Sequence, residues 1–331
     1  PDSSTKYPTT YFRTTVNNPD PSLFYNFPLR VKYDDGIAVY INGVEKLRQN
    51  LSSTATFNRF ANGNIGDEAG WKDFTLPRSE LVPGLIGYWP FDSASQIEGG
   101  RMVDLVAGIE GEVLGDTAAT EGHLGGAVDF GKSPGGSWIS VDASNGWLTP
   151  ASDANKLSVS LWQKLHSRVS SSTFWFGASS ANNGERNFQA HIPWGGGDIY
   201  FDTAGCCGGG DTRINKGSDI DYLEWHHFVF IKDGDHKEIW IDGELFHEGE
   251  NATPLFDDWT ALGIGSNSTG GSNVAGIVDD FGVWARGITP DEIASIYNGG
   301  KGSPLMTEAL SAGANTIAVE IHQASGGSSD I

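Results

Sequence analysis

The sequence contains few cysteines, few cationic residues and no long apolar segment. Its 331 residues include two cysteines, which are adjacent at positions 206 and 207 and so cannot link distant parts of the chain. Lysine and arginine number 21 against 42 aspartates and glutamates, which leaves a net charge of −21. This balance argues against non-specific binding to nucleic acid or to an anionic membrane surface, since both require cationic side chains. No apolar run approaches the roughly 18–20 residues of a membrane helix, so we expect no membrane insertion.

Glycine and aromatic residues, by contrast, are abundant. The chain has 45 glycines, 17 phenylalanines, 11 tryptophans and 9 tyrosines, a composition that indicates a folded β protein with many turns. Pro1 is followed by neither the charged nor the apolar region of a signal peptide, so we take the chain to be part of a larger multidomain protein. The many acidic and glycine residues fit a secreted, calcium-containing environment.

Apolar and polar residues alternate with a period of two in many short segments, which is the pattern of half-buried β-strands. Such segments occur at residues 29–33, 38–41, 157–162, 226–231, 238–241 and 317–321. Asn42-Gly43 and Asp242-Gly243 are residue pairs typical of two-residue hairpin turns, and Asp34-Asp35-Gly36 predicts a further hairpin. The fold class is therefore all-β, of the sandwich or jelly-roll type.

One short helix is predicted near residue 290. Thr289, Pro290 and Glu292 have the residue types of an N-cap, a first helical position and the end of a capping box. An apolar stripe and two glycines follow, at Ile293, Ile296, Tyr297, Gly299 and Gly300. We expect about two turns of surface helix that packs on the sheets.

Residues 85–302 resemble a laminin-G-like domain, a concanavalin-A-like jelly roll of the lectin/glucanase superfamily. The resemblance rests on motifs in family order at residues 87–92, 125–130, 157–162, 225–229, 239–243 and 278–284, and on the capped helix. It implies a jelly roll that binds carbohydrate.

The flanking segments resemble a different module, a small β-sandwich of large secreted bacterial proteins. The resemblance is carried by residues 11–13, 33–43 and 315–323, and in that pattern residues 74–77 would continue almost directly to Asn315. We therefore predict a discontinuous small β-sandwich of residues 1–84 plus 303–331, with the jelly roll inserted in one of its loops. Two consecutive domains followed by a tail are the alternative, which we disfavour because the last segment is too short to fold alone.

The sequence predicts no catalytic site. Gly131 to Gly135 spells G-x-S-x-G, but Pro134 and further glycines make it a loop instead of a strand-to-helix elbow. A glycosidase needs two carboxyl groups that flank the bond, and the nearest candidates are Glu238, Asp242 and Glu244. Because Asp242 falls in the hairpin turn, outside the strand, we expect a protein that is not an enzyme.

A calcium site is implied by the laminin-G-like resemblance, in which Ca2+ often lies where the first and last strands meet. In this sequence that position would bring Asp92 close to Asp279 and Asp280. Calcium prefers several carboxylate and carbonyl oxygens, so these three residues are the predicted ligands. The alternative is that Asp279 and Asp280 only solvate the end of a strand.

The adjacent cysteines mark the predicted ligand-binding segment, residues 194–213. Adjacent cysteines can form a strained disulfide ring in an oxidising compartment, and such a ring would stiffen the loop. Aromatic faces stack on sugar rings while polar groups bind hydroxyls. The predicted binding residues are Trp194, Tyr200, Asp202, Cys206, Cys207 and Arg213. A purely structural loop cap and two free thiols are the alternatives.

These observations together predict a non-catalytic, calcium-stabilised region that binds a glycan or polysaccharide. We expect it outside the cell or at a bacterial cell surface, as part of an adhesin or of a polysaccharide-degrading enzyme. A glycan-cleaving enzyme of the same fold is the second hypothesis, and a purely structural spacer is the third.

Overall fold

The chain folds into two compact units, seen in a computed structural model. It describes residues 7–18, 26–53, 55–66, 70–77, 83–207, 212–303, 305 and 313–326. Unit 1 comprises Pro1–Arg78 and Thr307–Ile331, and unit 2 comprises Ser79–Met306. These divisions fall within a few residues of the predicted junctions near 84 and 303. Independent folding of the discontinuous unit remains a prediction.

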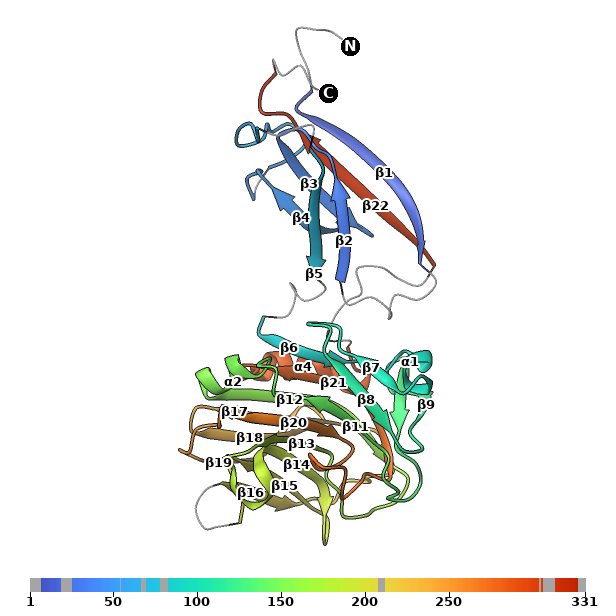
Figure 1. The fold of residues 1–331 in the computed structure, drawn as a ribbon, viewed down its shortest axis with the longest axis vertical. Coiled ribbons are helices and arrows are strands. Elements are labelled where there is room, and N and C mark those ends of the chain that lie inside the picture. Colours follow the sequence, from blue (N-terminus) through green and yellow to red (C-terminus); the bar gives the residue numbers. More distant parts are fainter. Residues whose placement is uncertain are drawn as a thin grey trace. The chain divides into compact units, whose positions relative to one another are not determined.

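Unit 1 consists of six strands in two sheets (Figure 1). The strands are β1 (Thr9–Asn18), β2 (Asn26–Val31), β3 (Gly36–Ile41), β4 (Val44–Gln49), β5 (Lys72–Pro77) and β22 (Gly313–His322). One sheet has the order β1-β22-β3-β4, and the other is the pair β2-β5. Tyr33, Ile37 and Val39 form the buried core, against which Phe74 and Val319 pack.

The segment Asp34-Asp35-Gly36 corrects one prediction, because it does not form a hairpin turn. β2 pairs with β5, whereas β3 pairs with β22 and β4, so this segment connects two different sheets. Both aspartates are buried, and Asp35 Oδ2 accepts a hydrogen bond from the Ala324 amide at 2.6 Å. The predicted turn at Asn42-Gly43 is confirmed, with left-handed φ values of 49° and 86°.

Unit 2 contains two eight-stranded antiparallel sheets (Figure 1). Sheet I comprises β6 (Leu85–Trp89), β9 (Ala118–Glu121), β10 (Gly126–Asp129), β12 (Lys156–Leu165), β17 (His226–Asp233), β18 (His236–Ile241), β19 (Glu244–Glu250) and β21 (Gly276–Trp284). Sheet II comprises β7 (Arg101–Val103), β8 (Glu110–Leu114), β11 (Trp138–Asp142), β13 (Phe174–Ala178), β14 (Arg186–Trp194), β15 (Asp198–Thr203), β16 (Arg213–Gly217) and β20 (Trp259–Ile264). The short helices are α1 (Ala94–Glu98), α2 (Thr149–Ala154), α3 (Asn182–Glu185), α4 (Pro290–Tyr297) and the 3-10 turn η2 (Asn298–Gly300). The all-β, jelly-roll prediction is confirmed.

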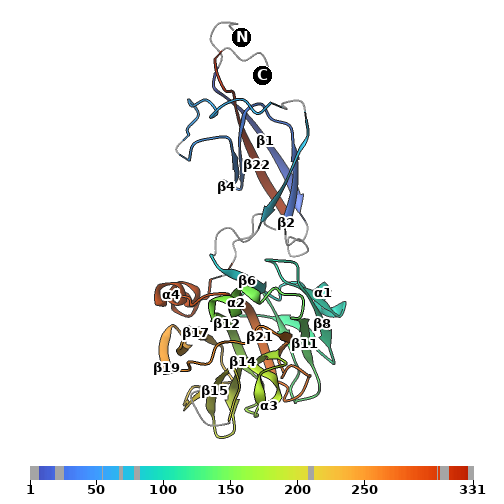
Figure 2. The ribbon, with the colours of Figure 1, turned by 60° about the vertical axis from the view of Figure 1, so that its left-hand side comes forward.

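The two sheets of unit 2 enclose one aromatic core. Phe174 and Phe201 of sheet II lie against Phe230 of sheet I, each with ring centroids 5.4 Å apart. Helix α4 lies over part of the opposite face of sheet I (Figure 2). Its Ile293 is fully buried in the same apolar cluster as Trp284. The predicted capping box between Thr289 and Glu292 is present. Sheet II therefore has one face in the core and one face directed away from sheet I, here called its outer face.

Candidate functional site

The outer face of sheet II collects polar and aromatic side chains from four neighbouring strands. Successive residues of a strand point to opposite faces, so a strand with phenylalanine in the core presents its intervening residues outward. In the strand register Trp175 lies opposite Gln189, Gln189 opposite Asp202, and Asp202 opposite Arg213. One row of functional side chains thus crosses from β13 to β16.

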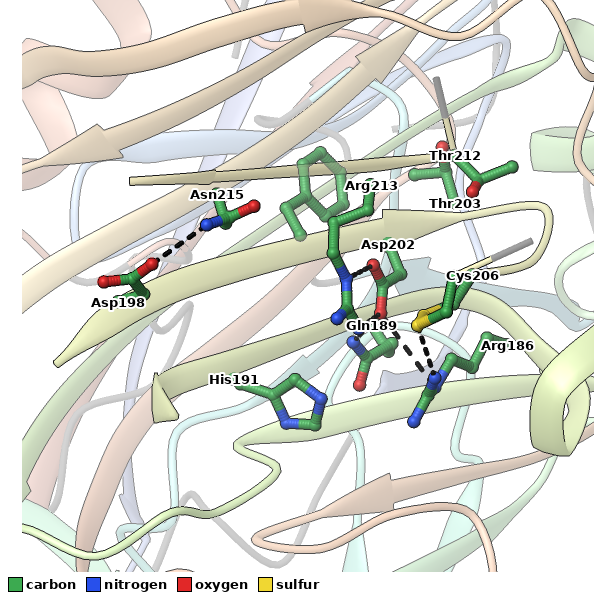
Figure 3. Close-up of polar contacts among 12 residues, drawn as sticks. Arg186, Gln189, His191, Asp198, Asp202, Thr203, Cys206, Thr212, Arg213 and Asn215 are labelled. Carbon is green, nitrogen blue, oxygen red and sulfur yellow. Dashed lines mark hydrogen bonds and ion pairs between the residues drawn. A yellow bond between two sulfur atoms is a disulfide. The ribbon is translucent and has the colours of Figure 1, made fainter. Parts of the chain in front are cut away.

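Asp202 is the centre of this row, and its carboxylate is completely buried. Arg213 donates from Nε to Oδ1 at 2.5 Å and from Nη2 to Oδ2 at 2.6 Å, and Gln189 Nε2 donates to Oδ2 at 2.6 Å. The Nε of Arg186 lies 3.9 Å from the same Oδ2 (Figure 3). Two guanidinium groups therefore flank a single carboxylate.

Aromatic rings extend the row in both directions. The Arg213 guanidinium lies 4.7 Å above the Tyr200 ring, and the Arg186 guanidinium lies 4.6 Å above the Trp175 ring. The His191 ring is 4.4 Å from that of Trp194, centroid to centroid. Burial lowers the pKa of His191 to about 4, so this ring is neutral at physiological pH. We define the outer-face patch as Trp175, Arg186, His191, Trp194, Tyr200 and Arg213.

Trp194 is the most accessible of the three aromatic side chains of the patch, with 36% of its surface exposed. It ends β14 and enters a turn that is held in place by hydrogen bonds. Gly195 N donates to Ser170 Oγ at 2.8 Å, and Gly197 N donates to the Trp194 carbonyl at 3.2 Å. Gly195 and Gly197 adopt φ values of 56° and 116°, which glycine tolerates without strain. The indole is therefore presented from a fixed backbone.

The adjacent cysteines form a disulfide bond beside the outer-face patch. Cys206 is buried, and its amide donates to Asn182 Oδ1 at 3.0 Å, whereas Cys207 is exposed. Arg186 Nη1 donates to Cys207 Sγ at 3.5 Å, so the disulfide contacts the patch through this arginine. Residues 208–211, which complete the predicted binding segment, lie outside the described residues.

The structure corrects two features of the predicted binding segment. Residues 194–213 are not a loop throughout, because β15 and the start of β16 lie within them. Asp202 offers no exposed oxygen to a ligand, since it is buried and bonded to Arg213 and Gln189. Its role is to position Arg213.

Four residues of the site were missed from sequence: Trp175, Arg186, Gln189 and His191. For Trp175, Gln189 and His191 the signal was the alternation with the core residues Phe174, Phe176, Phe188 and Ala190. Arg186 has the same parity as Phe188, and a register shift separates the two in the pairing of β13 with β14, so alternation could not have identified it.

The predicted calcium ligands do not assemble into a three-carboxylate cage. Asp279 accepts from the Leu124 amide at 2.9 Å, Asp92 accepts from the Gly126 amide at 2.7 Å, and Asp280 accepts from the Tyr88 hydroxyl. Within the described ranges no three His, Cys, Asp or Glu side chains gather in a metal-binding arrangement. Each acid instead supports a neighbouring segment of backbone or side chain.

Asp279 and Asp280 nevertheless carry a strong electrostatic cost. Burial raises the pKa of both carboxyl groups well above the usual range, and the charge of Asp280 adds to this effect at Asp279. Asp280 Oδ2 is buried without a hydrogen-bond partner. A bound proton or a cation would therefore stabilise these buried carboxyl groups.

A second surface feature of sheet II is a cavity of about 510 Å³ at its β7–β8–β11 end. Its polar lining is formed by Arg101, Glu110, Glu112, Ser140, Asp142 and Thr260. Glu110 is ion-paired with Arg101, and hydrogen bonds from Ser144 lower the pKa of Asp142. An ionised, hydrogen-bonded Asp142 cannot supply the proton that a glycosidase needs at its leaving group.

Asp242, one of the three acids that the sequence offers as glycosidase candidates, has a structural role. It lies in the hairpin turn with φ 51°, and its carboxylate accepts from His226 Nδ1 at 2.6 Å and from the His227 amide at 2.9 Å. It thus holds the start of β17.

The comparison with protein families identifies the fold family of unit 2. The model described as "Concanavalin A-like lectin/glucanases superfamily" matches residues 135–294. These residues belong to the concanavalin A-like lectin/glucanase superfamily. A search of curated proteins found no significant match.

Unit 2 is called the lectin-like domain from here on. Some solved structures resemble this chain at low sequence identity. The binding domain of botulinum neurotoxin DC, solved with rat synaptotagmin II, is 12% identical with a TM-score of 0.51, covering 65% of this chain and 51% of that one. The structure of the same binding domain with SialylT is 14% identical with a TM-score of 0.50 and the same coverage, so the similarity spans about half of the binding-domain chain. Domain 4 of AbnA, a GH43 extracellular arabinanase from Geobacillus stearothermophilus, was solved with arabinotriose. It is 18% identical with a TM-score of 0.48, covering 66% of this chain and 98% of that one. At these identities the neurotoxin similarities establish the fold alone.

Proposed function

We propose that the lectin-like domain binds carbohydrate, without cleaving it, through the outer-face patch. The observation that carries this proposal is the exposed Trp194 indole on a fixed turn, continuous through His191 with Tyr200 and Arg213. The CH faces of sugar rings stack on aromatic rings, while hydroxyl groups accept hydrogen bonds from guanidinium groups. A patch of this composition suits such a ligand.

We propose further that the chain acts outside the cell or at its surface, as an adhesive or substrate-targeting part of a larger protein. The Cys206–Cys207 disulfide supports an oxidising compartment. No helix in the described part of the chain is long and apolar enough to cross a membrane. An open site of this kind gives weak affinity for each copy, which many copies on one surface would increase through avidity.

Trp194→Ala tests the proposed site directly. Truncation of a tryptophan at a binding hot spot costs about 2 kcal/mol or more, so Trp194→Ala is expected to weaken glycan binding by at least about tenfold. The melting temperature should stay nearly unchanged, because the side chain is 36% exposed. A glycan array identifies the best oligosaccharide, and titration calorimetry then compares the variants.

Trp71→Ala is the matched control, since Trp71 is 58% exposed but belongs to unit 1. This variant should bind like the wild type. Unchanged binding by Trp194→Ala would move the site elsewhere. A wild-type protein that binds nothing on the array would favour the structural-spacer hypothesis.

We also propose that a calcium ion binds beside Asp279 and Asp280, completed by backbone carbonyls instead of by a third carboxylate. Two observations support it: the unpartnered Asp280 Oδ2 and the raised pKa of both carboxyl groups. A divalent cation would stabilise both ionised groups, as hard oxygen ligands require. Such an ion would hold β21 against the turn at residues 122–126.

Calcium is expected to raise the melting temperature of protein stripped with chelator. A ligand that binds only the folded state at a hundred times its Kd adds about 2.7 kcal/mol, equivalent to about 5–10 °C for a domain of this size. Asp280→Asn keeps an acceptor for Tyr88 but removes the charge, so it should abolish the response. Asp116→Asn, an exposed control, should not. Identical melting curves in chelator and in millimolar calcium, after removal of bound metal in denaturant, would contradict this proposal.

A further inference from the structure

Charge on the outer-face patch does not balance. Asp202, Arg186 and Arg213 are the charged groups that act on the neutral His191 at its centre, so two cations accompany one anion. Two nearby carboxylates have other hydrogen-bond partners: Asp198 of β15 accepts from Asn215 Nδ2 at 2.9 Å, and Glu185 at the end of α3 accepts from Thr260 Oγ1 at 3.1 Å. Among the described residues the patch therefore holds one excess positive charge, in a chain whose net charge is −21.

The two guanidinium groups also have donor capacity beyond their present partners. Arg213 uses Nε and Nη2 for Asp202, which leaves the Nη1 edge for another acceptor. Arg186 Nε is buried without a hydrogen-bond partner, and Nη1 donates to sulfur, which is a weak acceptor. A partly buried cationic donor without a strong acceptor destabilises the folded protein, and a bound anion would relieve this destabilisation.

We propose that the outer-face patch binds an oxyanion of the ligand, a carboxylate or a sulfate ester, between Arg186 and Arg213. The inference rests on the proposed carbohydrate function and narrows its ligand to acidic glycans. Arginine forks match the geometry of carboxylate and sulfate oxygens, and such charge-assisted bonds are about twice as strong as neutral ones. Tyr200, under Arg213, places a stacking face beside the bound anion.

Gln189 holds the Asp202 carboxylate in place between the two arginines. It is completely buried, donates Nε2 to Asp202, and leaves Oε1 without a hydrogen-bond partner. Like Asp202 it offers no exposed atom to a ligand, so the contacts with the bound anion come from Arg186 and Arg213.

The experiment compares pairs of probes that differ only in charge. One pair is an oligogalacturonate and its methyl ester, and the other is a sulfated galactan oligosaccharide and its desulfated form. The wild type is expected to bind one charged probe at least about tenfold more tightly than its neutral partner, as a charge-assisted hydrogen bond implies. Preference within the first pair identifies a carboxylate, and preference within the second identifies a sulfate ester.

Arg186→Gln should abolish this preference while the neutral probe still binds. Arg101→Gln, at the other end of sheet II, changes the net charge equally and should keep the preference. Arg186→Lys keeps the cation over Trp175 and should retain part of the preference, which covers the case in which the glutamine variant fails to fold. An unchanged ratio in folded Arg186 variants, or equal binding of charged and neutral probes by the wild type, overturns the inference.

Binding of inorganic sulfate tests the anion site independently of the proposed carbohydrate function. At constant ionic strength, sulfate should shift the Trp175 and Trp194 indole NMR signals in the wild type but not in Arg186→Gln. Sulfate binding without binding of any oligosaccharide would support the anion site and refute the carbohydrate function. Glycan binding that Trp194→Ala removes, with no charge preference and no sulfate effect, would support the function and refute the anion site.

Discussion

A chain truncated after Met306 is expected to lose the folded structure of residues 7–77 and to keep that of residues 83–303. The deleted segment contains β22, which lies between β1 and β3 in the four-stranded sheet. It pairs with the whole of β1, from Thr9 opposite His322 to Asn18 opposite Gly313. Without it β1 loses its partner strand, β3 keeps only β4, and the core loses Ile317, Val319 and Ile321.

Limited proteolysis and calorimetry measure this result. The truncated chain should show rapid cleavage before residue 78 and a single melting transition from the lectin-like domain. Truncation after Gly326 retains β22 and should leave both units folded.

Conversely, deletion of residues 86–301 with a short linker should yield a folded β domain by circular dichroism. Protection of residues 7–77 in the chain that lacks β22 would refute the discontinuous domain.

Arg213→Met is expected to lower the free energy of unfolding of the lectin-like domain by about 3–5 kcal/mol, the usual cost of leaving a buried charge without its partner. Asp202 is fully buried, and Arg213 makes two short hydrogen bonds to it. Arg186, whose Nε lies 3.9 Å away, is too distant to replace them as a donor. The destabilisation therefore comes from the buried Asp202 carboxylate, which loses its cationic partner, and not from the loss of the Arg213 side chain itself.

A double-mutant cycle isolates this pair. Asp202→Asn should cost less than Arg213→Met, because the half-buried guanidinium can still reach water, and the double variant should recover part of the loss. Lys216→Met on the same strand is the control, with an expected effect within about 0.5 kcal/mol for an exposed position. Strictly additive effects in chemical denaturation would show that the Asp202–Arg213 pair is not coupled.

Some features of this protein follow from short stretches of sequence. Helix α4 forms where Thr289, Pro290 and Glu292 predict it, because a capping box satisfies amide groups only three residues apart. The turns at Asn42-Gly43 and Asp242-Gly243 need residues that tolerate positive φ, and both adopt it. The Cys206–Cys207 bond needs no fold to bring its sulfur atoms together, since the residues are neighbours.

Strand pairing and the direction of side chains depended on the whole fold. Alternation identified β2 and β3 as strands, but only the tertiary structure pairs β2 with β5 and β3 with β22, which follows some 270 residues later. Register over such distances is determined by which apolar faces bury each other, and a local pattern does not contain that information.

The same reason governs the candidate site. Trp194, Tyr200, Asp202 and Arg213 could be grouped from sequence because they are close along the chain. Their roles could not be predicted from sequence, since Asp202 is buried only because the strands that carry Gln189 and Arg213 flank it. The sequence by itself determined several strands, the turns at Asn42-Gly43 and Asp242-Gly243, and helix α4, each of which depends on neighbouring residues. The tertiary structure alone decided that Arg186 stands beside Asp202 with an unused cationic donor, because that position requires four strands to meet in register.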